Sequence, residues 1–171
     1  MPRADATARP ARWLGVVALA AMLAGYQAIE TWRSGHAVLI NMSDSLPNWA
    51  FLLTKGSAPA FGDHVFFEAP RSQLLAAHFG PRPAPFGKRV LGMPGEVVRH
   101  HHRLVTVGVR VVGWTKPVTR TGMPLARGPQ GRIPPGCYYV GTDHPDGFDS
   151  RYAAIGFVCR RQILGVGTPV L

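Results

Sequence analysis

Two serines, Ser43 and Ser45, are the first residues whose type and position could support chemistry. They stand in the segment 43–47 (SDSLP), which follows the apolar run 36–40. A hydroxyl is thus presented at the end of an expected strand, and Pro47 restrains the chain beyond it. A serine becomes a nucleophile when a neighbouring base takes its proton. Taken alone, however, the segment is better explained as an ordinary turn.

A lysine, Lys88, opens the apolar segment 88–96 (KRVLGMPGE), which ends in a Pro-Gly turn. An amine at the start of a strand can serve as a base if it loses its proton. The plainer interpretation is a charge at the edge of a sheet.

The third segment, 141–152 (GTDHPDGFDSRY), has acidic residues and an arginine in a loop after an apolar strand. Asp149 and Arg151 are the pair of interest. The ordinary explanation is a turn closed by a surface ion pair, which contributes little to stability.

In order and composition, the three segments together resemble the conserved boxes of the type I signal peptidases, a family with a Ser/Lys dyad. They resemble most closely its conjugative-transfer (TraF-type) branch. The resemblance covers most of residues 36–166 and includes the segment 62–65 (GDHV), similar to the family's Gly-Asp-x-Val strand opening. Their joint occurrence is far more specific than any one segment.

The resemblance implies a role for each matching residue and no cofactor or metal. Ser45 corresponds to the nucleophile and Lys88 to the general base. Ser43 matches the position whose side chain joins the Ser45 backbone N–H in an oxyanion hole, which stabilises the tetrahedral intermediate. Asp149 and Arg151 match an ion pair that supports the wall of the site.

This chemistry requires an unusual environment for Lys88. A free lysine has a pKa near 10.4, so burial must lower the pKa toward roughly 7–8 for the amine to act as a base. We expect Phe86, Val90 and Leu91 to provide an apolar setting. Arg89, on the alternate face of the strand, should point away.

One position departs from the family pattern. Cellular signal peptidases have a serine that orients the lysine two residues before the Asp-Ser-Arg box, where this chain has Gly147. Ser150, Thr142 or water could replace it, or packing alone could hold the lysine. Asp149 should not lie close to the lysine, because a carboxylate would raise the lysine pKa.

The elements that must position these residues are mainly β. Short apolar or β-branched runs alternate with turn residues, and Gly108 marks a tight hairpin. One short helix is expected at 71–79, stopped by Gly80, with loops at 80–87 and 113–135. The resemblance implies a signal-peptidase-like β domain whose cap is reduced to 99–135. The expected strands are 36–40, 64–67, 89–91, 104–107, 109–112, 137–140 and 156–158.

The N-terminal segment is typical of a membrane anchor. Three arginines precede a stretch from Trp13 to Ile29 without a charged residue, and about 17–25 apolar residues span a bilayer. The flanking charges predict a cytoplasmic segment 1–12, a transmembrane anchor 13–32 and a periplasmic or extracytoplasmic peptidase domain 33–171, in an inner (cytoplasmic) membrane. A cleaved signal peptide is the competing interpretation.

Two cysteines, Cys137 and Cys159, have no zinc-binding spacing. An exported domain permits a disulfide, provided that the strands around Tyr138 and Val158 lie side by side. Two buried free thiols are the alternative, and the sequence leaves both open.

The chain has 171 residues, 46% of them hydrophobic, which excludes disorder as its main state. Its net charge of +10 invites a nucleic-acid interpretation. The basic residues are scattered, however, and aromatic residues do not alternate with them. The run 100–102 (HHH) alternates faces on a strand and does not converge on a metal.

We therefore expect a membrane-anchored serine endopeptidase that cleaves exported precursors. The resemblance indicates pilin-type subunits as substrates, with the lipid bilayer and components of a conjugative or type IV secretion apparatus as further partners, and no nucleic acid. The alternatives are a housekeeping signal peptidase I and an inactive membrane-tethered assembly component.

Overall fold

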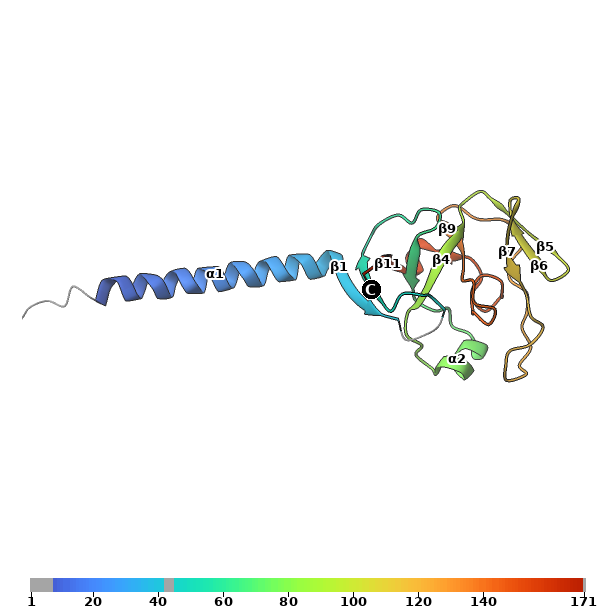
Figure 1. The fold of residues 1–171 in the computed structure, drawn as a ribbon, viewed down its shortest axis with the longest axis horizontal. Coiled ribbons are helices and arrows are strands. Elements are labelled where there is room, and N and C mark those ends of the chain that lie inside the picture. The colour runs from blue at the N-terminus through green and yellow to red at the C-terminus, as the bar shows by residue number, and fades with distance from the viewer. Residues whose placement is uncertain (1–7, 42–44, 171) are drawn as a thin grey trace, which may run out of the picture. The chain divides into compact units, whose positions relative to one another are not determined.

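The structure is a computed structural model that describes residues 8–41 and 45–170. The chain divides into two units, with the boundary after His36. The first contains the helix α1 (Ala8–Gly35), and the second contains all the remaining elements. Figure 1 shows these elements in chain order.

The middle of helix α1, residues 14–25, consists entirely of apolar residues. Its segment Trp13–Gly35 has a mean hydropathy of 1.4 and is long and apolar enough to cross a membrane. Large side chains such as Leu14, Val17 and Leu23 are exposed along it. A helix that is apolar all round requires an apolar environment, which a bilayer supplies. The helix therefore fits the expected anchor and extends beyond residue 32.

The second unit is built on two antiparallel sheets. The larger has seven strands in the order β1-β2-β11-β3-β4-β9-β10, and the smaller has four in the order β7-β6-β5-β8. The larger sheet consists of β1 (His36–Ile40), β2 (Ala50–Thr54), β11 (Ile163–Pro169), β3 (His64–Phe67), β4 (Phe86–Gly92), β9 (Cys137–Gly141) and β10 (Val158–Cys159). The smaller consists of β7 (Arg110–Trp114), β6 (Leu104–Val107), β5 (Val97–His101) and β8 (Gly131–Arg132).

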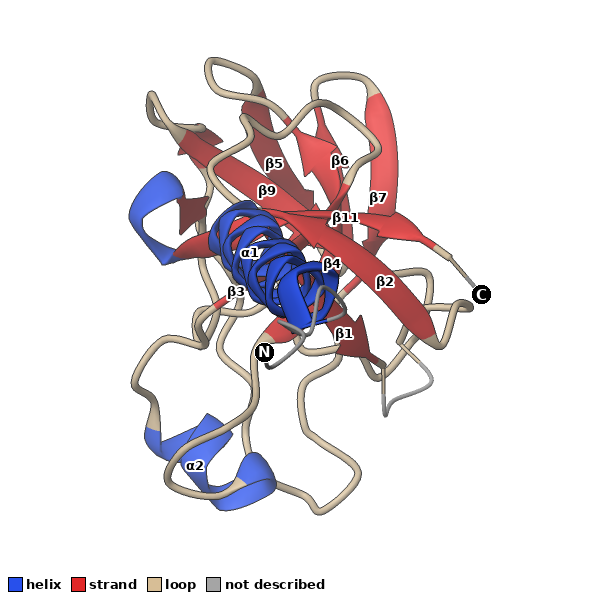
Figure 2. Ribbon diagram, turned by 90° about the vertical axis from the view of Figure 1, so that its left-hand side faces the viewer, coloured by secondary structure: helices blue, strands red, loops and turns tan. Residues whose placement is uncertain are grey.

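Two short helical elements complete the unit. Helix α2 (Gln73–Phe79) lies on the long connection between β3 and β4 (Figure 2), and η1 (Arg160–Gln162) precedes β11. Gly80 follows α2 as expected, and Leu75 anchors the helix in the core. The expected fold class, mainly β with an N-terminal apolar helix and one short additional α-helix, is confirmed.

Several expected boundaries were wrong. Strand β4 begins at Phe86, so the loop expected at 80–87 ends earlier, and β8 lies inside the loop expected at 113–135. Strands β2, β5 and β11 were missed. The two glycines of β11 are typical of a turn in the sequence, but in the structure they allow close packing. A Cβ on Gly167 would lie 2.5 Å from Cε2 of Phe66, and a Cβ on Gly165 would lie 2.5 Å from the Thr54 carbonyl oxygen.

Strands β4 and β9 separate two hydrophobic clusters. Val90, Tyr138 and Val140 pack into a cluster with residues of β3 and α2, which we call the main core. Leu91 and Tyr139 pack on the other face, with residues of the smaller sheet. Because side chains alternate along a strand, these two central strands contribute to both clusters.

The two cysteines form a disulfide. Cys137 on β9 and Cys159 on β10 are directly paired in the strand register, next to the pair Tyr138 and Val158. The sequence condition that these strands be neighbours is met, and the free-thiol alternative is excluded.

Candidate active site

Lys88 is a buried lysine on a central strand. Its residue is only 5% exposed, whereas the next residue, Arg89, is exposed. The alternation along β4 places Lys88 on the same face as Phe86 and Val90, and its Nζ lies 5.8 Å from the centroid of the Phe86 ring. The expected apolar setting and the outward position of Arg89 are both observed. Leu91, by contrast, faces the other cluster.

Burial changes the basicity of this amine. Desolvation of the ammonium lowers the pKa of Lys88 to about 8, Asp149 acts in the opposite direction, and Arg151 lowers the pKa further. An amine with this pKa is neutral in an appreciable fraction of molecules near neutral pH. It can therefore accept a proton, which an ordinary surface lysine rarely does.

Asp149 and Arg151 form a buried ion pair beside the lysine. The Arg151 guanidinium donates from Nε to Oδ1 at 2.8 Å and from Nη2 to Oδ2 at 2.7 Å of Asp149. Neither residue is more than 4% exposed. Since the guanidinium neutralises the carboxylate, Asp149 raises the lysine pKa less than a lone carboxylate would. The pair is thus buried, not the surface ion pair of the ordinary explanation.

The loop that contains Ser45 lies against the strand of Lys88. The residue after the serine, Leu46, is buried, and its Cδ1 would lie 3.1 Å from a Cβ built on Gly87. Asn41 fixes this loop, because its Nδ2 donates to the carbonyl oxygens of Leu46 and Asn48, both at 3.0 Å. The neighbours of Ser45 and Lys88 in the chain are therefore in contact.

Ser43, the expected oxyanion-hole residue, lies outside the described residues. Sequence analysis also missed Asn41, whose amide shapes the Ser45 loop. A signal was present, because asparagine at the end of a strand commonly bonds to nearby backbone.

The loop 141–152 contains Gly147, which stands where the family has its lysine-orienting serine, and the two possible replacements, Ser150 and Thr142. Gly147 has no room for a side chain, because a Cβ there would lie 2.5 Å from Oγ1 of Thr142. The Ser150 hydroxyl already accepts a hydrogen bond from the Val140 amide at 2.9 Å. Thr142 is buried, and its hydroxyl has no hydrogen-bond partner among the described residues.

The segment after β7 is fastened to the same loop. Asp146 accepts hydrogen bonds from Lys116 and from Arg120 Nε, the latter at 2.8 Å. The Gly128 amide donates to the Arg151 carbonyl oxygen at 2.7 Å, and the Tyr152 hydroxyl accepts from the Lys116 amide at 3.1 Å. This segment, within the expected cap, thus braces the loop that holds Asp149 and Arg151.

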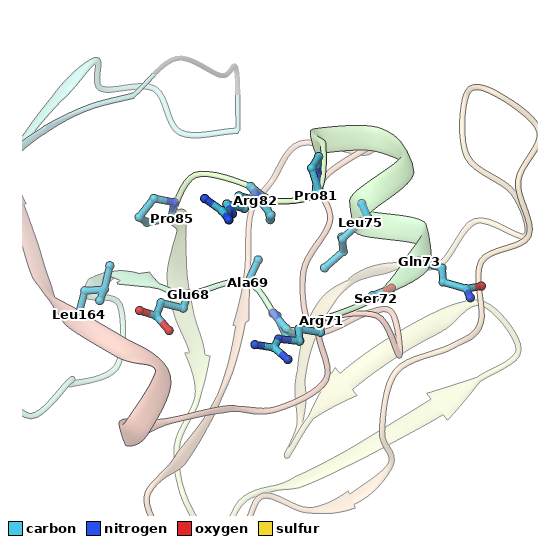
Figure 3. A pocket seen from close by; sticks show the side chains of 13 residues that line it. Glu68, Ala69, Arg71, Ser72, Gln73, Leu75, Pro81, Arg82, Pro85 and Leu164 are labelled. Carbon is cyan, nitrogen blue, oxygen red and sulfur yellow. The ribbon is translucent and has the colours of Figure 1, made fainter.

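A separate cavity of about 790 Å³ opens beside α2 (Figure 3). Its wall includes Glu68, Arg71, Leu75, Arg82 and Pro85. Neither Ser45 nor Lys88 lines it. We therefore do not assign the chemistry to this cavity.

The three histidines of the run 100–102 differ in exposure. His101 and His102 are exposed at the β5–β6 turn, where His102 has a φ of 55°. His100 is partly buried, with burial and Arg127 lowering its pKa. Among the described ranges 8–41 and 45–170, no group of three or more histidine, cysteine or acidic residues is placed to hold a metal ion.

Comparison with known proteins settles the family. A family model described as signal peptidase, peptidase S26, matches residues 11–171. The chain belongs to the S26 signal peptidase family. Membership of the S26 family supports a serine-type peptidase that acts on precursor proteins, and an N-terminal apolar helix in such a protein suggests a membrane anchor.

Among solved structures, the chain is similar to a signal peptidase I from Enterococcus faecalis V583. The two share 23% sequence identity with a TM-score of 0.40, over 66% of this chain and 98% of that chain. No curated protein matches the chain.

Proposed function

We propose that this S26 family member is a membrane-anchored serine endopeptidase in which Ser45 is the nucleophile and Lys88 the general base. The observation that supports it most strongly is the buried amine of Lys88, with its pKa lowered to about 8. The contact of Leu46 with the backbone at Gly87 supports the pairing, because it joins the chain neighbours of the two residues.

The proposed reaction has two halves. In the first, neutral Lys88 takes the hydroxyl proton of Ser45 while Oγ attacks the scissile carbonyl carbon. The tetrahedral intermediate then collapses, the C–N bond breaks, and the lysine returns the proton to the leaving amine. In the second, a water loses a proton to Lys88 and attacks the acyl-enzyme, which releases the new carboxyl end and restores Ser45.

The remaining candidate residues are assigned supporting roles. The Ser43 hydroxyl and the Ser45 backbone N–H would donate to the oxyanion, the charge that develops in the transition state. Asp149 and Arg151 would stiffen the wall next to the lysine, since each is held by several hydrogen bonds in a buried position. None of these roles requires a cofactor.

The proposed topology places residues 1–12 in the cytoplasm, the anchor at 13–32 in the inner membrane and the peptidase domain 33–171 outside the cytoplasm. The arginines before the apolar segment 13–29 favour this orientation. The disulfide is consistent with it, because disulfides persist in oxidising compartments.

For the substrate, we propose pilin-type precursors of a conjugative transfer system. The Ser-Leu-Pro box and the small cap support the TraF-type branch over a housekeeping signal peptidase I. The two differ in selectivity. Incubating the purified enzyme with pilin-type precursors and with a panel of unrelated secretory precursors, followed by mass spectrometry, would separate them. Cleavage of the whole panel at similar rates would favour the housekeeping role.

The dyad itself is tested by substitution in the full chain. Precursor cleavage should fall by about a thousandfold or more in each of Ser45→Ala, Lys88→Ala and Lys88→Arg. The first variant removes the nucleophile, and the other two remove an amine that can lose its proton near neutral pH. In the wild type, kcat/KM should increase as the pH rises through about 8, where Lys88 becomes neutral.

Arg89→Ala is the matched control, since it removes a charge from the exposed face of the same strand. It should cleave at the wild-type rate. Wild-type cleavage by the Ser45→Ala or Lys88→Ala protein, measured by mass spectrometry of the products, would show that the assignment is wrong. A wild type that cleaves no precursor would instead favour the inactive assembly component.

A further inference from the structure

The hydroxyl of Thr142 is a buried polar group that the proposed mechanism has not yet used. The residue is 6% exposed, and its Oγ1 has no hydrogen-bond partner among the described residues. A buried hydroxyl left in this state destabilises the fold, so native proteins keep few of them without a functional reason.

Strand pairing brings this threonine opposite the lysine. Strands β4 and β9 are antiparallel, with Arg89 paired to Gly141 and Val90 paired to Val140. Strand β9 ends at Gly141, and the same register continued by one step would set Thr142, the next residue, opposite Lys88. Directly opposed residues project to the same face with Cβ atoms about 4.5–5.5 Å apart. Both side chains are buried there.

Neither Gly147 nor Ser150 competes with Thr142 for the position next to the Lys88 amine. Oγ1 lies 2.5 Å from the position that a Cβ of residue 147 would take, so a side chain at position 147 and the Thr142 hydroxyl exclude one another. The Ser150 hydroxyl is engaged with the Val140 amide. The backbone of Thr142 is itself fixed, because its amide donates to Oδ2 of Asp149 at 3.3 Å.

We propose that Thr142 is a positioning residue for Lys88: its hydroxyl oxygen, which is unbonded among the residues that the structure describes, accepts a hydrogen bond from the amine during catalysis and so directs the nitrogen lone pair toward Ser45. The inference rests on the proposed function of the dyad and adds to it the residue that orients the base. A neutral amine has two N–H bonds and one lone pair. Fixing one N–H therefore removes most of the rotational freedom of the group.

The same contact contributes after proton transfer. Once Lys88 has taken the serine proton it is an ammonium in an apolar site, where an acceptor is worth more than in water. Thr142 would thus stabilise the charged intermediate state of the base as well as its starting orientation.

The test compares Thr142→Val, which keeps the shape and removes the hydroxyl, with Thr142→Ser, which keeps the hydroxyl. Thr142→Val should lower kcat for precursor cleavage about 10- to 100-fold with little change in KM. Since the ammonium loses its acceptor, the acidic limb of the kcat/KM profile should also move to lower pH. Thr142→Ser should restore both. Unchanged kcat and an unchanged profile in Thr142→Val would overturn the proposal.

Ser150→Ala is the structural control. It removes a neighbouring buried hydroxyl that bonds to backbone, so it should lower the melting temperature while leaving the position of the pH profile unchanged. A shift of the same size in Ser150→Ala and Thr142→Val would show a general loosening of the loop and would overturn the specific role of Thr142.

A readout without catalysis separates this inference from the dyad assignment. The full chain, in detergent micelles and with isotope-labelled lysine, can be titrated by NMR to follow the Lys88 amine. Thr142→Val should lower the Lys88 pKa even if Ser45→Ala shows that the protein does not use the dyad. An unchanged Lys88 pKa with an active wild type would contradict the role of Thr142 alone.

Discussion

The buried amine of Lys88 lowers the free energy of unfolding of the protein. The folded state lowers its pKa from 10.5 to about 8, so the folded protein holds the proton less tightly than the unfolded chain. Below pH 8 the full penalty applies. As the pH rises from about 8 to about 10.5, the folded protein releases the proton first and its stability increases. Above that range both states are neutral.

We therefore predict that Lys88→Met is more stable than the wild type at pH 7, by about 3 kcal/mol, because the pKa shift sets the penalty and methionine keeps most of the apolar stem. The advantage should shrink as the pH rises toward 10.5. Urea unfolding of both proteins at several pH values measures this difference. A constant difference across that range would contradict a lowered pKa.

At the residue scale, the sequence was sufficient to predict the buried side chain of Lys88 beside Phe86 and Val90 and the outward position of Arg89. These follow from strand alternation around one lysine. The position of the Thr142 hydroxyl could not be predicted, because it depends on the register between two strands that are distant in sequence. Its conflict with a side chain at Gly147 depends also on the path of the following loop.

At the scale of elements, strand β4 positions both halves of the candidate site. It holds Lys88 directly, and at Gly87 it contacts the Leu46 side chain of the serine loop. The expected strands β1, β3 and β6 have their expected bounds, since each is an apolar run closed by turn residues. Strand β11 was not predictable in this way, because its glycines are set by close contacts with neighbouring strands.

A Cβ at Gly87 should therefore disturb the serine loop. It would lie 2.8 Å from Cε1 of Phe66 and 3.1 Å from Cδ1 of Leu46, so one of these side chains must move. We predict that Gly87→Ala lowers kcat for precursor cleavage about tenfold or more and lowers stability by about 1–3 kcal/mol. Steady-state kinetics and thermal unfolding measure the two effects. Wild-type kcat in this variant would mean that the contact between Leu46 and Gly87 does not determine the conformation of the Ser45 loop.

At the scale of the whole molecule, a hydrogen-bonded segment and a disulfide hold the wall of the site in place. The segment after β7 is tied to Asp146, Arg151 and Tyr152 by hydrogen bonds. The Cys137–Cys159 disulfide, with a sequence separation of 22, closes a ring that contains the entire loop 141–152. The sequence predicted that a pairing was possible but not that it occurs, because the neighbouring positions of β9 and β10 are a tertiary property.

We predict that replacing both cysteines by serine lowers the free energy of unfolding by about 3 kcal/mol, the amount expected for a ring of this size. Reduction of the wild type with dithiothreitol should have a similar effect. Guanidinium unfolding with and without the reductant measures both. Equal midpoints would show that the bond does not stabilise the fold.

The disulfide-closed ring also makes the rigidity of this protein depend on the compartment in which it matures. A newly synthesised copy held in a glutathione-rich cytosol would have every residue of the wall but not the covalent closure around it. In the proposed topology, the disulfide would form only after translocation, when an oxidant reaches the two thiols. Recombinant preparation in a reducing host would accordingly give a looser protein than one made in an oxidising compartment.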